Sequence, residues 1–215
     1  MRPELAALVV HDLKNALGAL EAELGILAAR SSKPSATSTP NPDDGDLARH
    51  SHRQCTELRQ RFVQFLAVYA TGDQMPAHCS DESPRDLLVT LAQASRPTLP
   101  PGVVLGIAET GEEPAFWYFD RRLVRMALDA ALHNAKRFAR QHIELSARSE
   151  DGYLVLSVDD DGPGLGEADP LTDSTGLGTT LCESVARAHS TTARTGRVVL
   201  KNRPEGGARF ELWLG

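Results

Sequence analysis

The chain has 215 residues, of which 41% are hydrophobic and 24% are charged, and this is the composition of a soluble protein with one large domain or two small ones. Its formal net charge of −6 argues against a nucleic-acid-binding surface, because such a surface needs a net basic face. Three cysteines without a CxxC spacing favour the cytoplasm over a disulfide framework or a zinc site, and the lack of any run near ~18 apolar residues predicts no insertion into a membrane.

Residues 5–30 are predicted to form an amphipathic helix, because apolar side chains recur there at steps of three and four. Residues 31–45 hold three prolines and many small polar side chains, so we expect a flexible connection. A second amphipathic pattern begins at Asp46, which is a favoured N-cap residue type. Two helices cannot enclose a core, so the hairpin is predicted to pair with a second copy as a four-helix bundle, which implies a homodimer.

The polar residues 72–84 predict a linker between this hairpin, residues 1–71, and a second domain, residues 85–215. The second domain is predicted to be an α/β two-layer sandwich, in which helices cover one face of a sheet with alternating strands. Its predicted elements are helices at residues 85–94, 120–139 and 177–188 and strands at residues 103–108, 142–147, 153–159, 197–201 and 209–214. The fold class of the whole chain is therefore predicted to be α+β.

The stretch VDDDGPG at residues 158–164 ends a predicted strand with three acids and a glycine turn. A carboxylate held at a strand end can accept a hydrogen bond from an exocyclic amine, and Gly162 and Gly164 would let the backbone approach a flat base. We interpret this stretch as the floor of a nucleotide pocket. A solvated turn between two strands is the alternative interpretation.

Asn134 lies on the flank of the apolar face of the helix predicted at residues 120–139. A carboxamide at this place can ligate Mg²⁺ through its oxygen. Arg137 shares that flank and is assigned to the nucleotide phosphates, whereas Lys136 is predicted to point to the far side and into solvent. The alternative is that this basic last turn only complements the helix dipole.

Gly176 and Gly178 directly precede and begin the helix predicted at residues 177–188. The backbone amides and the amino end of that helix could hold phosphate oxygens. The alternative is an ordinary turn before a helix, with N-cap residue types at residues 173–175.

His11 begins the sequence HDLKN on the first predicted helix. At about 100° per residue it lies about 200° from both Val9 and Leu13 of the apolar stripe, so its imidazole is predicted to point into solvent. We interpret His11 as a nucleophile toward phosphorus, with Asp12 taking the ring proton and Asn15 orienting a water for the reverse, hydrolytic reaction. A surface histidine beside a surface acid is the alternative.

Taken in order, these stretches resemble the motifs of the catalytic core of a two-component sensor histidine kinase. Residues 11–15 match that family's H-box, residues 134–138 look like its N-box, and residues 160–164 are similar to its first glycine box. Residues 176–178 are similar to its second glycine box, and residues 206–210, GGARF, resemble its terminal strand signature. The resemblance implies a Bergerat-type domain that binds ATP and Mg²⁺, passes the γ-phosphoryl group to histidine, and has its adenine-binding aspartate at Asp160.

The chain departs from the family pattern at three places. Ala130 stands where the family often has a second asparagine, so one polar contact near the metal is expected to be missing. Only eleven residues separate Gly164 from Gly176 and none of them is phenylalanine, so the usual lid is expected to be short or absent. Because His11 comes so early, we expect either a free-standing kinase that receives its signal from a separate sensor protein or a fragment of a longer chain.

The leading hypothesis is a protein histidine kinase that phosphorylates His11 from Mg-ATP and passes the phosphoryl group to an aspartate of a response-regulator receiver domain. Response-regulator phosphatase activity is a further possibility through Asn15. The alternative is a non-catalytic dimeric histidine phosphotransfer protein with a degenerate nucleotide-binding domain, which the short lid favours. An ATPase or serine kinase of the same nucleotide fold would leave His11 and its hairpin unexplained.

Overall fold

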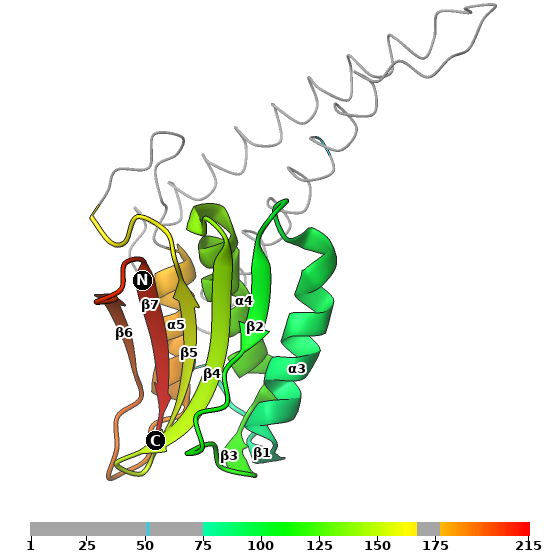
Figure 1. The fold of residues 1–215 in the computed structure, drawn as a ribbon. Helices are drawn as coiled ribbons and strands as arrows, with labels where there is room; N and C mark the ends of the chain where they lie inside the picture. Colours follow the sequence, from blue (N-terminus) through cyan, green and yellow to red (C-terminus); the bar gives the residue numbers. More distant parts are fainter. Residues whose placement is uncertain (1–50, 52–74, 167–176) are drawn as a thin grey trace, which may run out of the picture. The chain divides into compact units, whose positions relative to one another are not determined.

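The computed structural model describes residues 51, 75–166 and 177–215 (Figure 1). The chain divides into two compact units, Met1–Ala70 and Thr71–Gly215, and the described elements belong to the second. Apart from residue 51, the predicted helical hairpin with its dimeric bundle lies outside the described residues, as do His11, Asp12, Asn15 and Gly176. No helix in the part of the chain that is described is long and apolar enough to span a membrane.

A five-stranded sheet forms one layer of the second unit. Its order is β2-β4-β5-β7-β6, with β2 parallel to β4 and the other neighbours antiparallel. The strands are β2 (Val104–Ile107), β4 (His142–Glu150), β5 (Tyr153–Asp160), β6 (Arg197–Asn202) and β7 (Ala208–Leu214). Because β5 is the central strand, its carboxyl end lies at the middle of one edge of the sheet.

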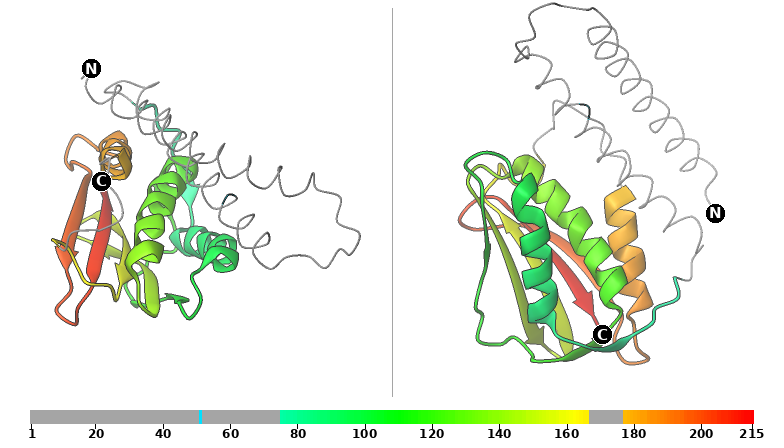
Figure 2. Two further views of the ribbon diagram at one scale, coloured as in Figure 1. Left: turned by 90° about the horizontal axis from the view of Figure 1, so that it is seen from above. Right: turned by 90° about the vertical axis from the view of Figure 1, so that its right-hand side faces the viewer.

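Three helices lie side by side on one face of this sheet (Figure 2). They are α3 (Pro84–Ser95), α4 (Arg121–Phe138) and α5 (Leu177–Ala188). N-cap hydrogen bonds fix the amino ends of α3 and α4. Ser83 accepts a hydrogen bond from the N–H of Asp86 at 3.2 Å, and Asp120 accepts from the N–H groups of Arg122 and Leu123. The mixed α+β arrangement of helices and sheet predicted from the sequence is confirmed.

The core lies between the helices and the sheet. It contains the buried side chains of α3, α4 and α5 and the inward-facing side chains of β4, β5 and β7. Burial alternates along β4 as the strand period requires, whereas β5 is buried on both faces over most of its length. The apolar face predicted for α4 is buried along most of its length, including Val124, Leu128 and Ala135. Phe138, the last residue of α4, is 37% exposed.

A two-stranded ribbon was not predicted from the sequence. Strands β1 (Ser80–Glu82) and β3 (Trp117–Phe119) pair antiparallel, and β1 falls inside the stretch predicted to be a linker. Strands of three residues are too short to show an alternating pattern, so the sequence carries no periodic signal for them. The 3-10 helix η1 (Arg96–Thr98) was not predicted either, and the other helices and strands of the second domain end within three residues of their predicted limits.

Candidate nucleotide-binding site

The acid-and-glycine loop, residues 159–165, leaves the central strand β5 at the edge of the sheet where α4 ends and α5 begins (Figure 1). Its three acids point to three different places, because the strand alternates its faces and then turns. Asp159 lies on the outer face of the sheet, where both its oxygens accept hydrogen bonds from the guanidinium of Arg209, one of them at 2.7 Å. Asp160 lies on the face that the helices cover, together with Leu156 and Val158.

The carboxylate of Asp160 is held through one oxygen only. Its Oδ1 accepts from the N–H of Gly162 at 2.8 Å and from the N–H of Ala208 in the neighbouring strand at 3.4 Å. Its Oδ2 receives no hydrogen bond from the part of the chain that the structure describes. Asp160 is 8% exposed, so it presents a fixed and largely desolvated acceptor that can take an amine donor.

Asp161 joins the loop to the connection between α4 and β4. Its carboxylate accepts from the N–H of Arg140 at 2.8 Å and from the N–H of Gln141 at 3.0 Å. Burial alone would raise the pKa of Asp161, but the backbone hydrogen bonds from His142, Gln141 and Arg140 outweigh that effect and lower the pKa. Asp161 therefore stays charged and fixes where the loop meets the end of α4.

Glycine is required at two positions of the loop for different reasons. A Cβ on Gly162 would lie 2.6 Å from the backbone oxygen of Phe138, which cannot move without breaking the end of α4. Gly164 has φ +92°, a conformation that side-chain-bearing residues rarely adopt. The backbone at these glycines therefore lies close to other parts of the protein itself. At Gly162 this contact brings the loop against α4.

Asn134 and Arg137 are exposed on the last two turns of α4, the end that Gly162 contacts. Asn134 precedes the buried Ala135 and lies one turn before Phe138, about 6 Å along the helix axis. The guanidinium of Arg137 lies 5.4 Å from the centroid of the Phe138 ring. An amide side chain and a cation therefore lie at the same edge as the carboxylate of Asp160.

Lys136 differs from its prediction. Its Nζ donates to the hydroxyl of Thr98 at 2.8 Å, so this side chain is not simply in solvent. Thr98 belongs to the short 3-10 helix η1 (Arg96–Thr98) that follows α3. Burial lowers the pKa of Lys136 below its usual value, while Asp129 opposes that shift. Lys136 and Arg137 thus lie on different sides of α4, as predicted, but Lys136 ties α4 to the neighbouring helical segment.

Gly178 lies in the first turn of α5, beside α4. A Cβ added to Gly178 would be 4.0 Å from the Cβ of Ala130, which is one turn before Asn134. Ala130, which departs from the family pattern, therefore lies where the amino end of α5 packs against α4. Free N–H groups at a helix amino end attract phosphate oxygens.

Two side chains with reactive groups, Cys182 and His189, are buried away from the acid-and-glycine loop. Cys182 is 2% exposed, its Sγ lies 3.4 Å from the carbonyl oxygen of Ala127, and burial raises the pKa of its thiol to about 12. His189 is 5% exposed and contacts backbone atoms through both ring nitrogens. Cys182 therefore belongs to the core, and His189 joins backbone groups inside it.

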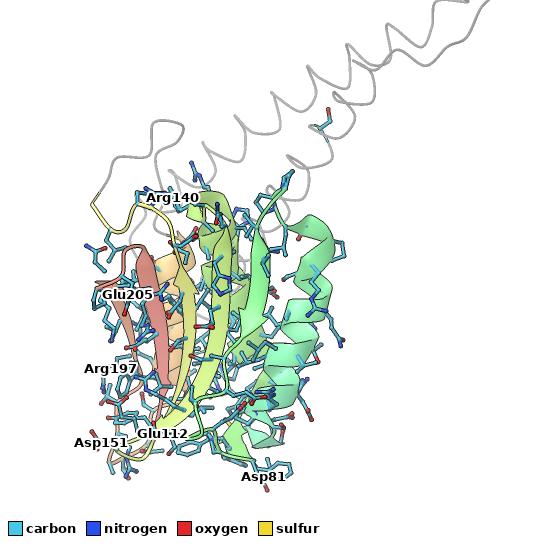
Figure 3. All side chains as sticks on the ribbon, viewed as in Figure 1. Asp81, Glu112, Arg140, Asp151, Arg197 and Glu205 are labelled. Carbon is cyan, nitrogen blue, oxygen red and sulfur yellow. The ribbon has the colours of Figure 1, made fainter. Side chains whose placement is uncertain are left out.

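The turn between β6 and β7, residues 202–207, contributes to the site in a way that was not predicted from the sequence. Its side chains and the following Ala208 and Arg209 form hydrogen bonds with Asp159, Asp160 and Leu165 at the two ends of the acid-and-glycine loop. Figure 3 shows Glu205 of this turn toward the same end of the sheet as Arg140, with Asp151 at the opposite end. The GGARF stretch was recognised as a family signature, but the sequence gives no sign that it holds the loop 48 residues earlier.

Comparison with known proteins identifies this arrangement. Residues 119–215 match the family of histidine kinase-, DNA gyrase B-, and HSP90-like ATPases. The sensor protein kinase CarS of Pseudomonas aeruginosa is 27% identical over 94% of the chain, and the chain spans 46% of the length of CarS. Histidine kinase AdeS of Acinetobacter baumannii has a solved structure with a TM-score of 0.68, at 18% identity and covering 95% of this chain and 97% of AdeS.

Histidine kinase ThkA has been solved in complex with the response regulator protein TrrA. That structure has a TM-score of 0.67 to this chain, at 15% identity and covering 98% of this chain and 60% of ThkA. This likeness shows that ThkA and this chain share a fold. The sequence-based resemblance to the catalytic core of a histidine kinase is confirmed by the family match together with these relatives.

Proposed function

Since the chain has the catalytic core of a two-component histidine kinase, we propose that it is an ATP-dependent protein histidine kinase. It phosphorylates His11 from Mg-ATP and passes the phosphoryl group to an aspartate of a response-regulator receiver domain. The observation that carries the proposal is the carboxylate of Asp160, whose Oδ1 is fixed by two backbone N–H groups while Oδ2 accepts no hydrogen bond from the described residues.

An adenine amine fits that acceptor better than a guanine does. The exocyclic amine of adenine donates hydrogen bonds, whereas guanine carries a carbonyl oxygen at the corresponding ring position, and two acceptors repel each other. Gly162 lets the loop lie against the backbone oxygen of Phe138, and its N–H holds Oδ1 of Asp160, so the carboxylate is fixed before a base arrives. Asp160, Gly162 and Gly164 are therefore proposed to bind the base.

The polyphosphate is proposed to lie toward α4 and α5. Arg137 would compensate its charge, Gly176 and Gly178 would offer backbone N–H groups, and the amide oxygen of Asn134 would hold Mg²⁺, which prefers oxygen ligands and keeps several waters. The exposed positions of Asn134 and Arg137 at the same edge as Asp160 fit this assignment. Mg-ATP supplies a phosphoryl group that can leave from its terminal position.

His11 is proposed to accept that phosphoryl group. One ring nitrogen forms the bond to phosphorus while the bond to the leaving phosphate oxygen breaks, and Asp12 takes the proton from the imidazole. Asn15 is proposed to orient a water in the hydrolytic reaction with the response regulator. These three residues lie outside the described part of the chain, so their roles rest on the sequence.

Two partners are proposed. The first is a second copy of the chain, joined through the hairpin of residues 1–71 as a four-helix bundle, with residues 72–84 leading to the ATP-binding domain of residues 85–215. The second is a response regulator, which the complex of the related fold ThkA with TrrA supports. We further propose that the protein receives its signal from a separate sensor protein and that it is located in the cytoplasm.

The test is phosphorylation with γ-labelled ATP and Mg²⁺. Purified protein should acquire label that is lost in acid and kept in base, and the His11→Gln variant should stay unlabelled. Label on the His11→Gln variant would overturn the assignment of His11. A wild-type protein that takes no label from ATP but accepts it from a phosphorylated regulator would instead establish the alternative, a non-catalytic phosphotransfer protein.

A further inference from the structure

The β6–β7 turn contacts the acid-and-glycine loop at both of its ends. The side-chain Oδ1 of Asn202 accepts a hydrogen bond from the N–H of Leu165 at 2.5 Å. A Cβ added to Gly164 would lie 2.8 Å from that same oxygen, so the carboxamide lies directly against the glycine. Asn202 thus fixes the end of the loop that leaves the sheet.

Arg203 fixes the other end. Its Nη1 donates to the backbone oxygen of Asp160 at 3.1 Å, and its Nε lies 3.6 Å from Oδ2 of Asp159. The turn itself is closed by a hydrogen bond from the N–H of Arg203 to the backbone oxygen of Gly207 at 3.0 Å. A Cβ on Gly207 would lie 1.9 Å from the backbone oxygen of Asp160, so the two backbones are as close as glycine allows.

We propose that Asn202 and Arg203 are positioning residues for base recognition, an inference that rests on the proposed nucleotide site. A loop with glycines at positions 162 and 164 has many accessible conformations, and ordering it upon binding would weaken affinity. The contacts of Asn202 and Arg203 hold the loop in the conformation in which Oδ2 of Asp160 accepts no hydrogen bond from the described residues. Neither side chain needs to touch the nucleotide to act in this way.

A positioning role and a merely structural role predict different effects of mutation on stability and on nucleotide affinity. Loss of a structural contact lowers the stability of the fold but leaves the site unchanged in the molecules that remain folded. Loss of a positioning contact moves Asp160, so the affinity for ATP falls more than the affinity for GTP, which does not use the amine acceptor. The ratio of the two affinities is therefore the informative measurement.

Calorimetric titration of the full chain with Mg-ATP and with Mg-GTP, well below the unfolding temperature, provides the test. Asn202→Ala should bind ATP about fivefold to tenfold more weakly, the loss of about one hydrogen bond, and should lose part of its preference over GTP. Asn202→Asp keeps an acceptor oxygen and should stay within about twofold of the wild type. Arg203→Lys keeps the charge but not the hydrogen-bond geometry to Asp160, and should weaken ATP binding as Asn202→Ala does.

Arg197→Ala is the matched control, because Arg197 lies on the same strand as Asn202 at its other end (Figure 3). If Asn202→Ala binds ATP as tightly as this control does, or loses ATP and GTP affinity equally, the inference is wrong. Asp160→Asn in the same titrations distinguishes the proposed nucleotide site from the proposed positioning role. If Asp160→Asn loses ATP binding and Asn202→Ala has no effect, the positioning role is wrong and the nucleotide site is still supported. A wild-type protein without ATP affinity would refute both.

Discussion

The backbone N–H of Asp120 donates a hydrogen bond to Nε2 of His189 at 3.0 Å, joining the start of α4 to the residue after α5. The other ring nitrogen of His189 lies 2.7 Å from the backbone oxygen of Val185. A ring that accepts at Nε2 and donates at Nδ1 is a neutral imidazole. Burial accordingly lowers the pKa of His189 below its ordinary value of 6.5, although the hydrogen bond to Val185 and the charge of Asp120 oppose the shift.

This relationship predicts that the free energy of unfolding falls as the pH drops below about 6.5. In that window the unfolded chain binds a proton at His189 and the folded protein does not, so protonation favours unfolding. Below the folded pKa the effect levels off. Urea unfolding of the wild type and of His189→Gln between pH 7.5 and pH 5 checks this, because the variant should lose part of the slope. Identical slopes would contradict the assignment of a neutral His189.

Glu211 is predicted to stabilise the outer face of the sheet. It is 1% exposed and accepts from Nζ of Lys201 at 3.0 Å and from Nη2 of Arg148 at 3.2 Å. Glu211→Ala should lower the free energy of unfolding by about 2 kcal/mol, because hydrogen bonds between charged partners are lost. Glu183→Ala is the control: it removes an exposed pair on α5 whose atoms are 3.9 Å apart and should cost less than about 0.5 kcal/mol. Equal costs in chemical denaturation would refute the prediction.

Gly162→Ala is predicted to damage both stability and nucleotide binding. The new Cβ would lie 2.6 Å from the backbone oxygen of Phe138, so the loop must shift, at a cost of about 1–3 kcal/mol in the free energy of unfolding. Gly106→Ala is the control, since the nearest atom to its added Cβ is 3.8 Å away. Thermal unfolding with and without Mg-ATP measures both effects. A Gly162→Ala variant that ATP stabilises as well as it does the Gly106→Ala variant would show that the loop is not part of the site.

Arg137→Ala is predicted to weaken ATP binding about tenfold, because it removes a charge from the proposed phosphate site. Lys136→Ala removes a charge from the adjacent residue, which contacts Thr98 instead, and should leave ATP affinity within about twofold of the wild type. Fluorescence competition with a labelled nucleotide gives both values. The assignment of Arg137 fails if the Lys136→Ala variant loses as much affinity as the Arg137→Ala variant.

Local sequence features predicted most of the described fold. Helices α3 and α4 begin at capping residues, and the strands of the large sheet show a period of two, which are signals contained in a few neighbouring residues. The ribbon of β1 and β3 carries no such signal, because each strand has three residues and its pairing depends on a partner about 37 residues away.

The roles of the three adjacent acids could be predicted only in part. Alternation along β5 separates Asp159 from Asp160, but their partners, Arg209 and the N–H of Ala208, come from a strand that is 48 to 50 residues later. Asp161 acts on the connection after α4, about 20 residues earlier. Such contacts follow from the strand order β4-β5-β7, which the sequence pattern does not specify.

Calorimetry of the full chain with Mg-ATP tests directly whether Oδ2 of Asp160 accepts a hydrogen bond from the base of ATP. Asp160→Asn should weaken ATP binding by about a hundredfold, because an amide can present a donor where an acceptor is needed. Asp151→Asn is the matched control, because it makes the same substitution at the opposite end of β5, at φ 51°, which asparagine tolerates. Unchanged ATP affinity in the Asp160→Asn variant would contradict the account.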